Sequence, residues 1–440
     1  MTEMIESILF KNVQILTASG QRQGDVYVLN GKIVAVQPVL NVAAECVIQD
    51  KGLTLMPGVF DPHVHFREPG FPEKETIYSG SKAAVRGGVT SFFEMPNTNP
   101  PTIDAKTVAQ KKAIAAETSL ANYNFFIGAT TTNCEALNQV ENVPGIKIFV
   151  GSSTGNMCVD DQTLLELIFS SGNRLIAVHS EDEATIQKNR LQFKDTQNVD
   201  DHYRIRDVNA AMIATKRVVA LANRFKRRLH ICHLTTGEEA EYLAQCESPY
   251  VTTEVTPQHL LLWAPECYAK LGTFAQINPP IRQKRHADAL WHHLKRGTIH
   301  CVGTDHAPHT IPEKMKPFGD APSGMPGVET SLPLFLTLAA QGKCTYSAVV
   351  KWLSAAPAQI YQVPQKGDIS EGFDADLTLV DLNKRHTLSN AAMQTNAGWS
   401  AFEGWDCQGE VVATFVNGQP VYREGEFFES IKGKEIKIGV

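Results

Sequence analysis

Eight short apolar runs occupy the central part of this chain, and most of the intervals between them are long enough for a helix. Two of the intervals, 210–225 and 286–295, have a helical pattern. Repeated strand and helix in this order is typical of a parallel sheet, and eight such units close naturally into a barrel. The runs cover residues 54–60, 90–95, 123–127, 145–150, 175–178, 229–232, 250–255 and 299–304.

Both ends of the chain have a different pattern, in which short strands alternate with turns. Asn30-Gly31 and Asn417-Gly418 are strong hairpin signals. Neither end has enough strands for a stable domain, so we expect both to join in one small β-sandwich beside the barrel. The predicted fold is therefore a (β/α)8 barrel of the TIM type over residues 58–364, with 1–57 and 365–440 forming the sandwich. Two independent appendages are the alternative.

The composition of the chain limits the classes of protein to which it can belong. The 440 residues are 43% hydrophobic, which suits one large core and a smaller one. A net charge of -6 argues against nucleic-acid binding, and no apolar stretch approaches the roughly 20 residues that span a bilayer. Nine cysteines without a Cys-x-x-Cys pair suit reduced thiols. We expect a cytoplasmic protein without nucleic-acid or membrane partners.

The first apolar run leads into His63-Val64-His65. Alternate residues of a strand point to one side, so these two imidazoles would emerge together and could bind one metal ion. The alternative is two histidines that flank a buried valine.

Four further candidate ligands lie within or at the end of later runs, namely Lys147, His179, His233 and Asp305. Active sites of (β/α)8 barrels lie at the carboxyl ends of the strands, where these residues would meet His63 and His65. Scattered structural histidines would have no reason to follow this pattern. The sequence therefore predicts a metal centre inside the barrel mouth.

Four motifs together resemble the dihydroorotases of the amidohydrolase superfamily, over nearly the whole chain. They are Asp-Pro-His-Val-His-Phe-Arg-Glu-Pro-Gly at 61–70, Met-Pro-Asn-Thr at 95–98, Ile-Asn-Pro-Pro at 277–280 and Gly-Thr-Asp-His-Ala-Pro-His at 303–309. The resemblance implies two zinc ions, the more buried one bound by His63 and His65 and its neighbour by His179 and His233. Asp305 would also contact the metal.

At Lys147 the chain resembles the branch of the family that uses a carboxylated lysine, whereas many bacterial relatives with the same first motif use an aspartate. An ammonium has no lone pair, but a neutral amine that adds carbon dioxide becomes a carbamate whose two oxygens can bridge two cations. The cofactor prediction is therefore two Zn²⁺ ions bridged by carboxylated Lys147. A lysine that reaches solvent is the alternative.

Asp305 is the predicted catalytic acid and base, with a helix N-cap as its alternative role. Arg67, two residues after His65, would share its face on a continuing strand and could bind a carboxylate through two hydrogen bonds. The resemblance adds Asn97, Asn278 and His309 as substrate-binding residues. Their alternatives are a surface ion pair of Arg67 with Glu68, two turn asparagines and an exposed loop histidine.

The function implied by the resemblance is reversible, zinc-dependent cyclisation of N-carbamoyl-L-aspartate to L-dihydroorotate, a small-molecule reaction of pyrimidine synthesis. Another cyclic amidohydrolase, such as an allantoinase or hydantoinase, would share the metals and the mechanism, although Arg67 in its motif argues against it. A non-catalytic scaffold is the third reading. The state of assembly stays open, with a homodimer among the options.

Overall fold

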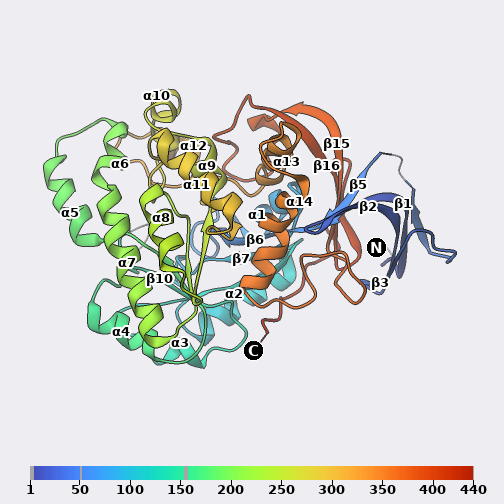
Figure 1. Ribbon diagram of the computed structural model, residues 1–440, viewed down its shortest axis with the longest axis horizontal. Coiled ribbons are helices and arrows are strands. Elements are labelled where there is room, and N and C mark those ends of the chain that lie inside the picture. Colours follow the sequence, from blue (N-terminus) through green and yellow to red (C-terminus); the bar gives the residue numbers. More distant parts are fainter. Residues whose placement is uncertain (1–3, 50–51, 153–156, 440) are drawn as a thin grey trace.

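The barrel of this chain, seen in its computed structural model, is built from parallel strands that follow one another in chain order (Figure 1). The structure describes residues 4–49, 52–152 and 157–439. β8 and β9 pair with different neighbours on either side of Phe126 and together fill the third of eight positions. A bridge between Val64 and His306 closes the ring. The strands are β6 (Val59–Val64), β7 (Val89–Glu94), β8 (Asn122–Phe125), β9 (Ile127–Gly128), β10 (Ile146–Phe149), β11 (Ile176–His179), β12 (Leu229–Ile231), β13 (Val251–Val255) and β14 (Cys301–Val302).

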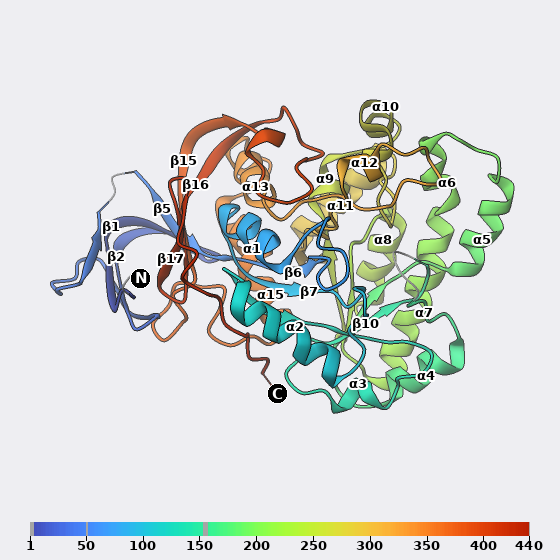
Figure 2. The same cartoon turned by 180° about the vertical axis from the view of Figure 1, so that it is seen from behind.

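Helices cover the outside of the barrel (Figures 1 and 2). The two predicted helical intervals are α7 and α11, and the Asp207 side chain caps α7 by accepting a hydrogen bond from the Ala210 amide. The helices are α1 (Ile77–Arg86), α2 (Ala105–Thr118), α3 (Ala136–Gln139), α4 (Gln162–Ser170), α5 (Glu183–Gln192), α6 (His202–Ile205), α7 (Val208–Phe225), α8 (Gly237–Cys246), α9 (Pro257–Leu261), α10 (Glu266–Leu271), α11 (Lys284–Arg296), α12 (Ile311–Lys314), α13 (Ser331–Ala340), α14 (Tyr346–Val350) and α15 (Ala356–Ile360). Among the described helices, none is both long and apolar enough to cross a membrane.

Strands from both ends of the chain form one sheet beside the barrel, drawn in blue and red in Figure 1. β5 joins the two halves, because it pairs with β1 on one edge and with β15 on the other. The sheet curls until the rings of Phe10 and Phe415 lie 5.1 Å apart. A barrel with a flanking sheet domain confirms the predicted fold class. The strands are β1 (Ser7–Thr17), β2 (Gly20–Leu29), β3 (Lys32–Gln37), β4 (Cys46–Ile48), β5 (Thr54–Pro57), β15 (Leu377–Thr387), β16 (Asp406–Val416), β17 (Gln419–Arg423) and β18 (Glu426–Phe427).

The two Asn-Gly hairpin turns form as predicted and touch each other. Asn30 and Gly31 have φ values of 50° and 77°, and Asn417 and Gly418 have values of 50° and 75°. Positive φ at both central residues is the requirement of a type I′ turn. A Cβ atom on Gly31 would lie 2.6 Å from the carbonyl oxygen of Asn417, so this contact also requires glycine. The turns thus connect the two ends of the chain.

Beneath the barrel mouth, the interior is filled by side chains. The rings of Phe60 and Phe93 lie 4.8 Å apart edge to face, and Phe126 extends this layer. Ala177, Cys232 and Cys301 complete it. This packed layer closes the lower part of the barrel, so polar side chains above it face a cavity that opens at the carboxyl ends of the strands.

Candidate metal centre

The cavity at the barrel mouth brings together most of the site residues that the sequence predicts. All six candidate metal ligands line it, as do three of the four candidate substrate-binding residues. Its lining residues are His63, His65, Arg67, Asn97, Lys147, Phe149, His179, His233, Asn278, Asp305, Ala307, Ser323 and Gly324. His309, the fourth predicted substrate-binding residue, lies directly behind this lining, 3.2 Å from Arg67.

His63 and His65 present their Nε2 atoms to a shared point. The Nδ1–H group of His63 donates to Glu254 at 2.5 Å, and that of His65 donates to Asn97 Oδ1 at 2.6 Å. Both Nε2 atoms lie close to Asp305 Oδ1, at 3.3 and 3.1 Å. Since each Nδ1 atom is occupied by its hydrogen bond, each ring turns Nε2 to the cavity, where an unprotonated Nε2 would bind a metal ion.

His179 and His233 form a second pair of nitrogen donors. His179 Nδ1 lies 3.1 Å from His233 Nε2, while its Nε2–H group donates to Glu181 at 2.9 Å. Two nitrogens bound to one zinc ion at tetrahedral positions lie about 3.4 Å apart. The spacing therefore suits a shared metal ion.

Lys147 lies between these two pairs and is completely buried. Its Nζ atom contacts Cys232 Sγ at 3.2 Å and lies 5.1 Å from the centre of the Phe149 ring. Among the described residues, no carboxylate oxygen lies within ion-pairing distance of this amine. A side chain that reaches solvent is thus excluded. A buried ammonium without a counter-ion is costly.

Asp305 occupies the last position in this group, on the loop that follows β14. The N-cap alternative is excluded, because the next helix, α12, is capped by Thr310. Asp305 has a positive φ of 47°, a conformation that non-glycine residues rarely adopt and that turns the carboxylate toward His63 and His65. Although burial opposes it, these two histidines hold the pKa of Asp305 below its ordinary range.

The charges of the group fit a bound cation. Burial and Lys147 act to lower the pKa of His63, but Glu254 and Asp305 outweigh them and raise it to about 10. The position that the extra proton would take is His63 Nε2, which has no hydrogen-bond partner among the described residues. Burial keeps the neighbouring His65 neutral by lowering its pKa to about 3. A metal ion at His63 Nε2 would supply the positive charge that these carboxylates favour, so the donor set fits the predicted metal centre.

Arg67 reaches the cavity for a different reason from the one predicted. β6 ends at Val64, and Arg67 has a φ of 61°, so it does not continue the strand. It is 3% exposed and donates to the carbonyl oxygen of Pro308 at 3.1 Å, not to Glu68. No carboxylate oxygen of the described chain forms an ion pair with its guanidinium group. The surface ion pair is thus excluded, and the cation faces the cavity unpaired.

His309 is 1% exposed, so its alternative role as an exposed loop histidine is excluded. The ammonium of Lys74 can only donate, and it lies 3.3 Å from His309 Nδ1. His309 Nε2 lies 3.1 Å from the Ser323 carbonyl oxygen and 3.2 Å from the guanidinium group of Arg67, which can also only donate. Asn97 and Asn278 line the cavity, with Asn278 Oδ1 lacking a partner within the described residues.

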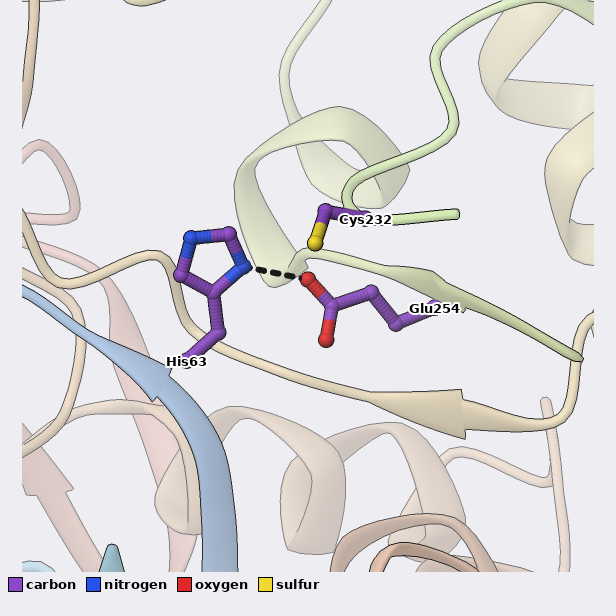
Figure 3. A group of neighbouring side chains, drawn as sticks. All are labelled: His63, Cys232 and Glu254. Atoms are coloured by element: carbon purple, nitrogen blue, oxygen red, sulfur yellow. Dashed lines mark hydrogen bonds and ion pairs between the residues drawn. The ribbon is translucent and has the colours of Figure 1, made fainter. Parts of the chain in front are cut away.

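Glu254 and Glu181 orient the histidine ligands, and the sequence analysis missed both. Glu254 accepts a hydrogen bond from His63 (Figure 3). It accepts a second one, at 3.2 Å, from His230, which is buried. Cys232 lies beside the pair of His63 and Glu254. Glu181 holds His179 and is paired with buried Arg206. Glu254 lies near the end of an apolar run and Glu181 follows one, and this position was the one signal in the sequence for their role.

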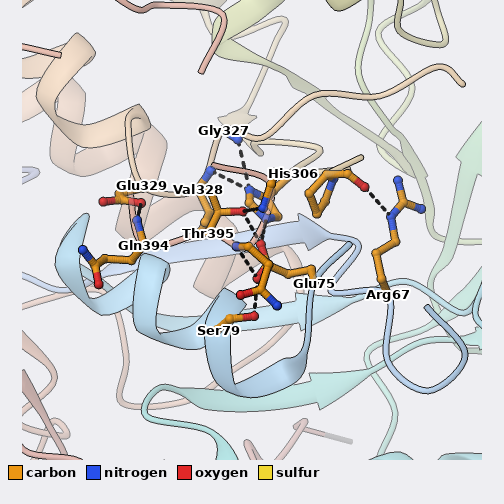
Figure 4. Close-up of polar contacts among 12 residues, drawn as sticks. Arg67, Glu75, Ser79, His306, Gly327, Val328, Glu329, Gln394 and Thr395 are labelled. Atoms are coloured by element: carbon orange, nitrogen blue, oxygen red, sulfur yellow. Dashed lines mark hydrogen bonds and ion pairs between the residues drawn. The ribbon is translucent and has the colours of Figure 1, made fainter. Parts of the chain in front are cut away.

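A buried polar network fixes the loop that carries Asp305 (Figure 4). His306 Nδ1 accepts from the amides of Gly327 and Val328 at 3.1 and 3.3 Å, so its Nε2–H group faces Glu75 at 3.4 Å. Glu75 also accepts from Thr395, in the long connection between β15 and β16. The sheet domain thus contributes to the position of the loop beside the metal ligands.

Comparison with known proteins gives consistent results. The model of the amidohydrolase family matches residues 54–421. The dihydroorotase of Methanosarcina acetivorans is 34% identical, over 96% of this chain and 95% of its own. That of Methanothermobacter thermautotrophicus is 35% identical, over 91% of each. Among solved structures, the L-hydantoinase (dihydropyrimidinase) of Arthrobacter aurescens is 27% identical and has a TM-score of 0.94, over 99% of this chain and 100% of its own.

Proposed function

Because this chain belongs to the amidohydrolase family, and because its curated relatives are dihydroorotases, we propose that it is a dihydroorotase. It hydrolyses a cyclic amide: it interconverts L-dihydroorotate and N-carbamoyl-L-aspartate, a step of pyrimidine synthesis. The substrates are small molecules. A scaffold without activity is disfavoured, since every predicted ligand lines one cavity.

One observation supports this substrate above others, namely the unpaired guanidinium of Arg67. A buried cation without a counter-ion is unfavourable, so a carboxylate on the substrate would stabilise it. The planar guanidinium can form two parallel hydrogen bonds with such a group. Dihydroorotate carries a ring carboxylate, and the unsubstituted ring of dihydrouracil does not. Asn97 and His309, near Arg67, are the further proposed partners of this carboxylate, and Asn278 is proposed to bind the ring amides.

The structural likeness to hydantoinases makes hydantoin hydrolysis the second candidate. The same metal ligands and the same ring opening would serve both reactions. A hydantoin ring has no carboxylate, so it would leave Arg67 without a counter-ion. The observation that favours dihydroorotate therefore counts against this candidate.

The donor set supports the metal dependence that the family implies, and we propose two zinc ions bridged by carboxylated Lys147. His63 and His65 would hold one ion and His179 and His233 the other, with Asp305 in contact. When bound, such ions lower the pKa of water to near neutrality and polarise the carbonyl group under attack. Glu254, Asn97 and Glu181 fix the ring orientations that this binding needs.

Asp305 is the proposed acid and base. During ring opening, a carbon–oxygen bond forms at the ring carbonyl, and Asp305 takes the proton that the attacking water loses. The carbon–nitrogen bond of the ring then breaks, and Asp305 returns the proton to the departing nitrogen. Ring closure follows the same path in reverse. The lowered pKa of Asp305 keeps it ionised, which is the form that a base requires.

The test is ring closure of N-carbamoyl-L-aspartate by zinc-loaded protein, followed as dihydroorotate formation. Hydrolysis of hydantoin and of allantoin are the parallel assays. We expect closure to be fast and the two parallel activities to be weak. Turnover of hydantoin or allantoin without ring closure would keep the mechanism and overturn the substrate, and inactivity on all three would favour the scaffold.

The homodimer and the cytoplasmic location stay predictions. All nine cysteines are free, including the buried Cys232, Cys267, Cys301 and Cys407. Free thiols in this number suit a reducing compartment. Measuring the mass of the native protein in solution would test the dimer.

A further inference from the structure

Positive charge gathers on one side of the cavity, around His309. Arg67, Lys74 and Lys314 all lie near its ring, and the charge of each lowers the pKa of this histidine, after burial. Lys74 is paired with Glu313 at 2.9 Å. Arg67 and Lys314 are buried, and within the described chain neither has a carboxylate at ion-pairing distance. This side of the site therefore holds two buried cations without counter-ions.

Lys314, the last residue of α12, has neutral partners only. Its Nζ atom donates to the carbonyl oxygens of Gln276 at 3.0 Å and Pro322 at 2.8 Å, and lies 6.0 Å from the centre of the Trp399 ring. Carbonyl and ring dipoles stabilise an ammonium but supply no net negative charge. The ammonium would therefore gain from an anion nearby.

The position of Lys314 connects it to the substrate side of the cavity. Its two carbonyl partners belong to the segments that carry Asn278 and Ser323, both of which line the cavity. Lys314 itself is not part of the lining. It lies one layer behind the wall, where it can act on a bound ligand through its charge and through the segments that it holds.

We propose that Lys314 is a specificity-determining residue, whose buried ammonium adds to the charge of Arg67 and favours a substrate that carries a carboxylate. The inference rests on the proposed function, because it concerns the carboxylate of dihydroorotate. In a buried, weakly screened environment a charge acts over several ångströms, so direct contact with the ligand is not required. Lys314 would thus discriminate between rings with and without this group.

The experiment compares two ligands with the same ring. We would measure the KM of dihydroorotate and the inhibition constant of dihydrouracil, its analogue without the carboxylate, in the wild type and in Lys314→Met. Lys316→Met, an exposed lysine of the same segment, is the matched control. We expect the KM of dihydroorotate to rise about tenfold in Lys314→Met, with dihydrouracil and the control unchanged.

The outcomes separate the inference from the proposed function. A wild type that does not turn over dihydroorotate would refute the function. If the wild type is active, an equal loss for both ligands in Lys314→Met would show a merely structural residue, and no loss for either would show that its charge does not reach the site. Either of these two results would overturn the inference about Lys314 and leave the proposed function intact.

A second measurement uses the unmodified protein and so does not depend on how the variant folds. Burial, together with the charge of Arg67, lowers the pKa of Lys314 to about 7. Lys314 is therefore charged below this pH and neutral above it. The preference for dihydroorotate over dihydrouracil should be greatest below about pH 7 and fall above it.

The other charged groups near Lys314 do not change in this range. Arg67 keeps its charge, since burial lowers its pKa only to about 10. His309 stays neutral, and Glu313, paired with Lys74, stays ionised. The remaining neighbours, Trp399 and the two carbonyl groups, do not titrate. Effects of pH on the metals would change the affinities for both ligands alike and leave the preference unchanged. A preference for dihydroorotate that stays constant across this range would therefore also overturn the inference.

Discussion

The Nδ1 atom of His63 lies 2.5 Å from Oε1 of Glu254, and both side chains are buried beneath the cavity. The other carboxylate oxygen accepts from His230 at 3.2 Å. Glu254 therefore fixes the tautomer and the orientation of His63, the first histidine of the sequence motif. The arrangement is the carboxylate–histidine pair that commonly supports a metal ligand in proteins.

Replacing Glu254 tests this role. Glu254→Gln keeps one acceptor oxygen, but it presents an amide donor to His230, the second histidine. The side chain at position 254 is then held less firmly, so His63 loses part of its orientation. We expect metal affinity to fall roughly 10- to 100-fold, measured by competition with a chelator. Glu239→Gln is the control, because Glu239 is equally buried but bonds only to the hydroxyl groups of Thr215 and Thr236. Unchanged affinity in Glu254→Gln would remove the supporting role.

Lys147→Ala should lose both the metal and the activity. Without the side chain no carbamate can form, and the two pairs of histidines lose the group that would bridge their ions. Metal content, measured by atomic emission, should fall with turnover. Bicarbonate with a short carboxylic acid should partly restore both. A variant that retains two metal ions per chain would rule out the bridge.

Asp305→Asn should keep the metal and lose most of its turnover. The amide resembles the carboxylate in shape, but it cannot take a proton from water. We expect kcat to fall roughly 10²- to 10⁴-fold while the metal content stays near that of the wild type. A near-normal kcat would exclude Asp305 as the base.

Arg67→Lys and Arg67→Met should weaken carboxylate binding in two steps. Lysine keeps the charge but loses the planar pair of donors, and methionine loses both. We expect the KM of dihydroorotate to rise in Arg67→Lys and to rise further, roughly 10- to 100-fold, in Arg67→Met. Steady-state kinetics with fully metal-loaded protein would measure this. Equal KM values in the wild type and both variants would place the carboxylate elsewhere.

Glu329→Gln should raise stability at alkaline pH. Burial raises the pKa of Glu329 to about 7, although Arg86 opposes this. The folded state therefore favours the protonated acid, whose stabilising contribution is complete below about pH 4.5 and is lost as the pH rises through about 7. A neutral amide avoids this loss and can still accept from the Gln394 amide (Figure 4).

The measurement is chemical denaturation at several pH values. The variant should be more stable than the wild type by about 1–3 kcal/mol near pH 8, and the difference should vanish near pH 5. A difference that does not depend on pH would mean that Glu329 does not titrate in this range.

Much of the fold follows from local patterns in the sequence. The strand runs, the helical intervals around α7 and α11 and the two Asn-Gly turns depend on neighbouring residues, and they form at or near their predicted positions. The exception is the first run, 54–60, which divides between β5 of the flanking sheet and β6 of the barrel. The candidate ligands could be listed for the same reason, since the carboxyl end of a strand is a local property and parallel strands bring those ends together. The fold family follows from the order of these elements.

What surrounds the ligands was decided only by the tertiary structure. Glu254 contacts His63, from a strand far away in the sequence, and also His230, and no spacing marks the three as partners. Arg67 faces the cavity because its backbone turns away from the strand, not because the strand continues. Lys314 looks like a surface lysine until the chain folds around it. A sequence pattern shows which residues can bind or titrate, but burial and long-range contacts determine which of them lie unpaired, and that depends on the whole fold.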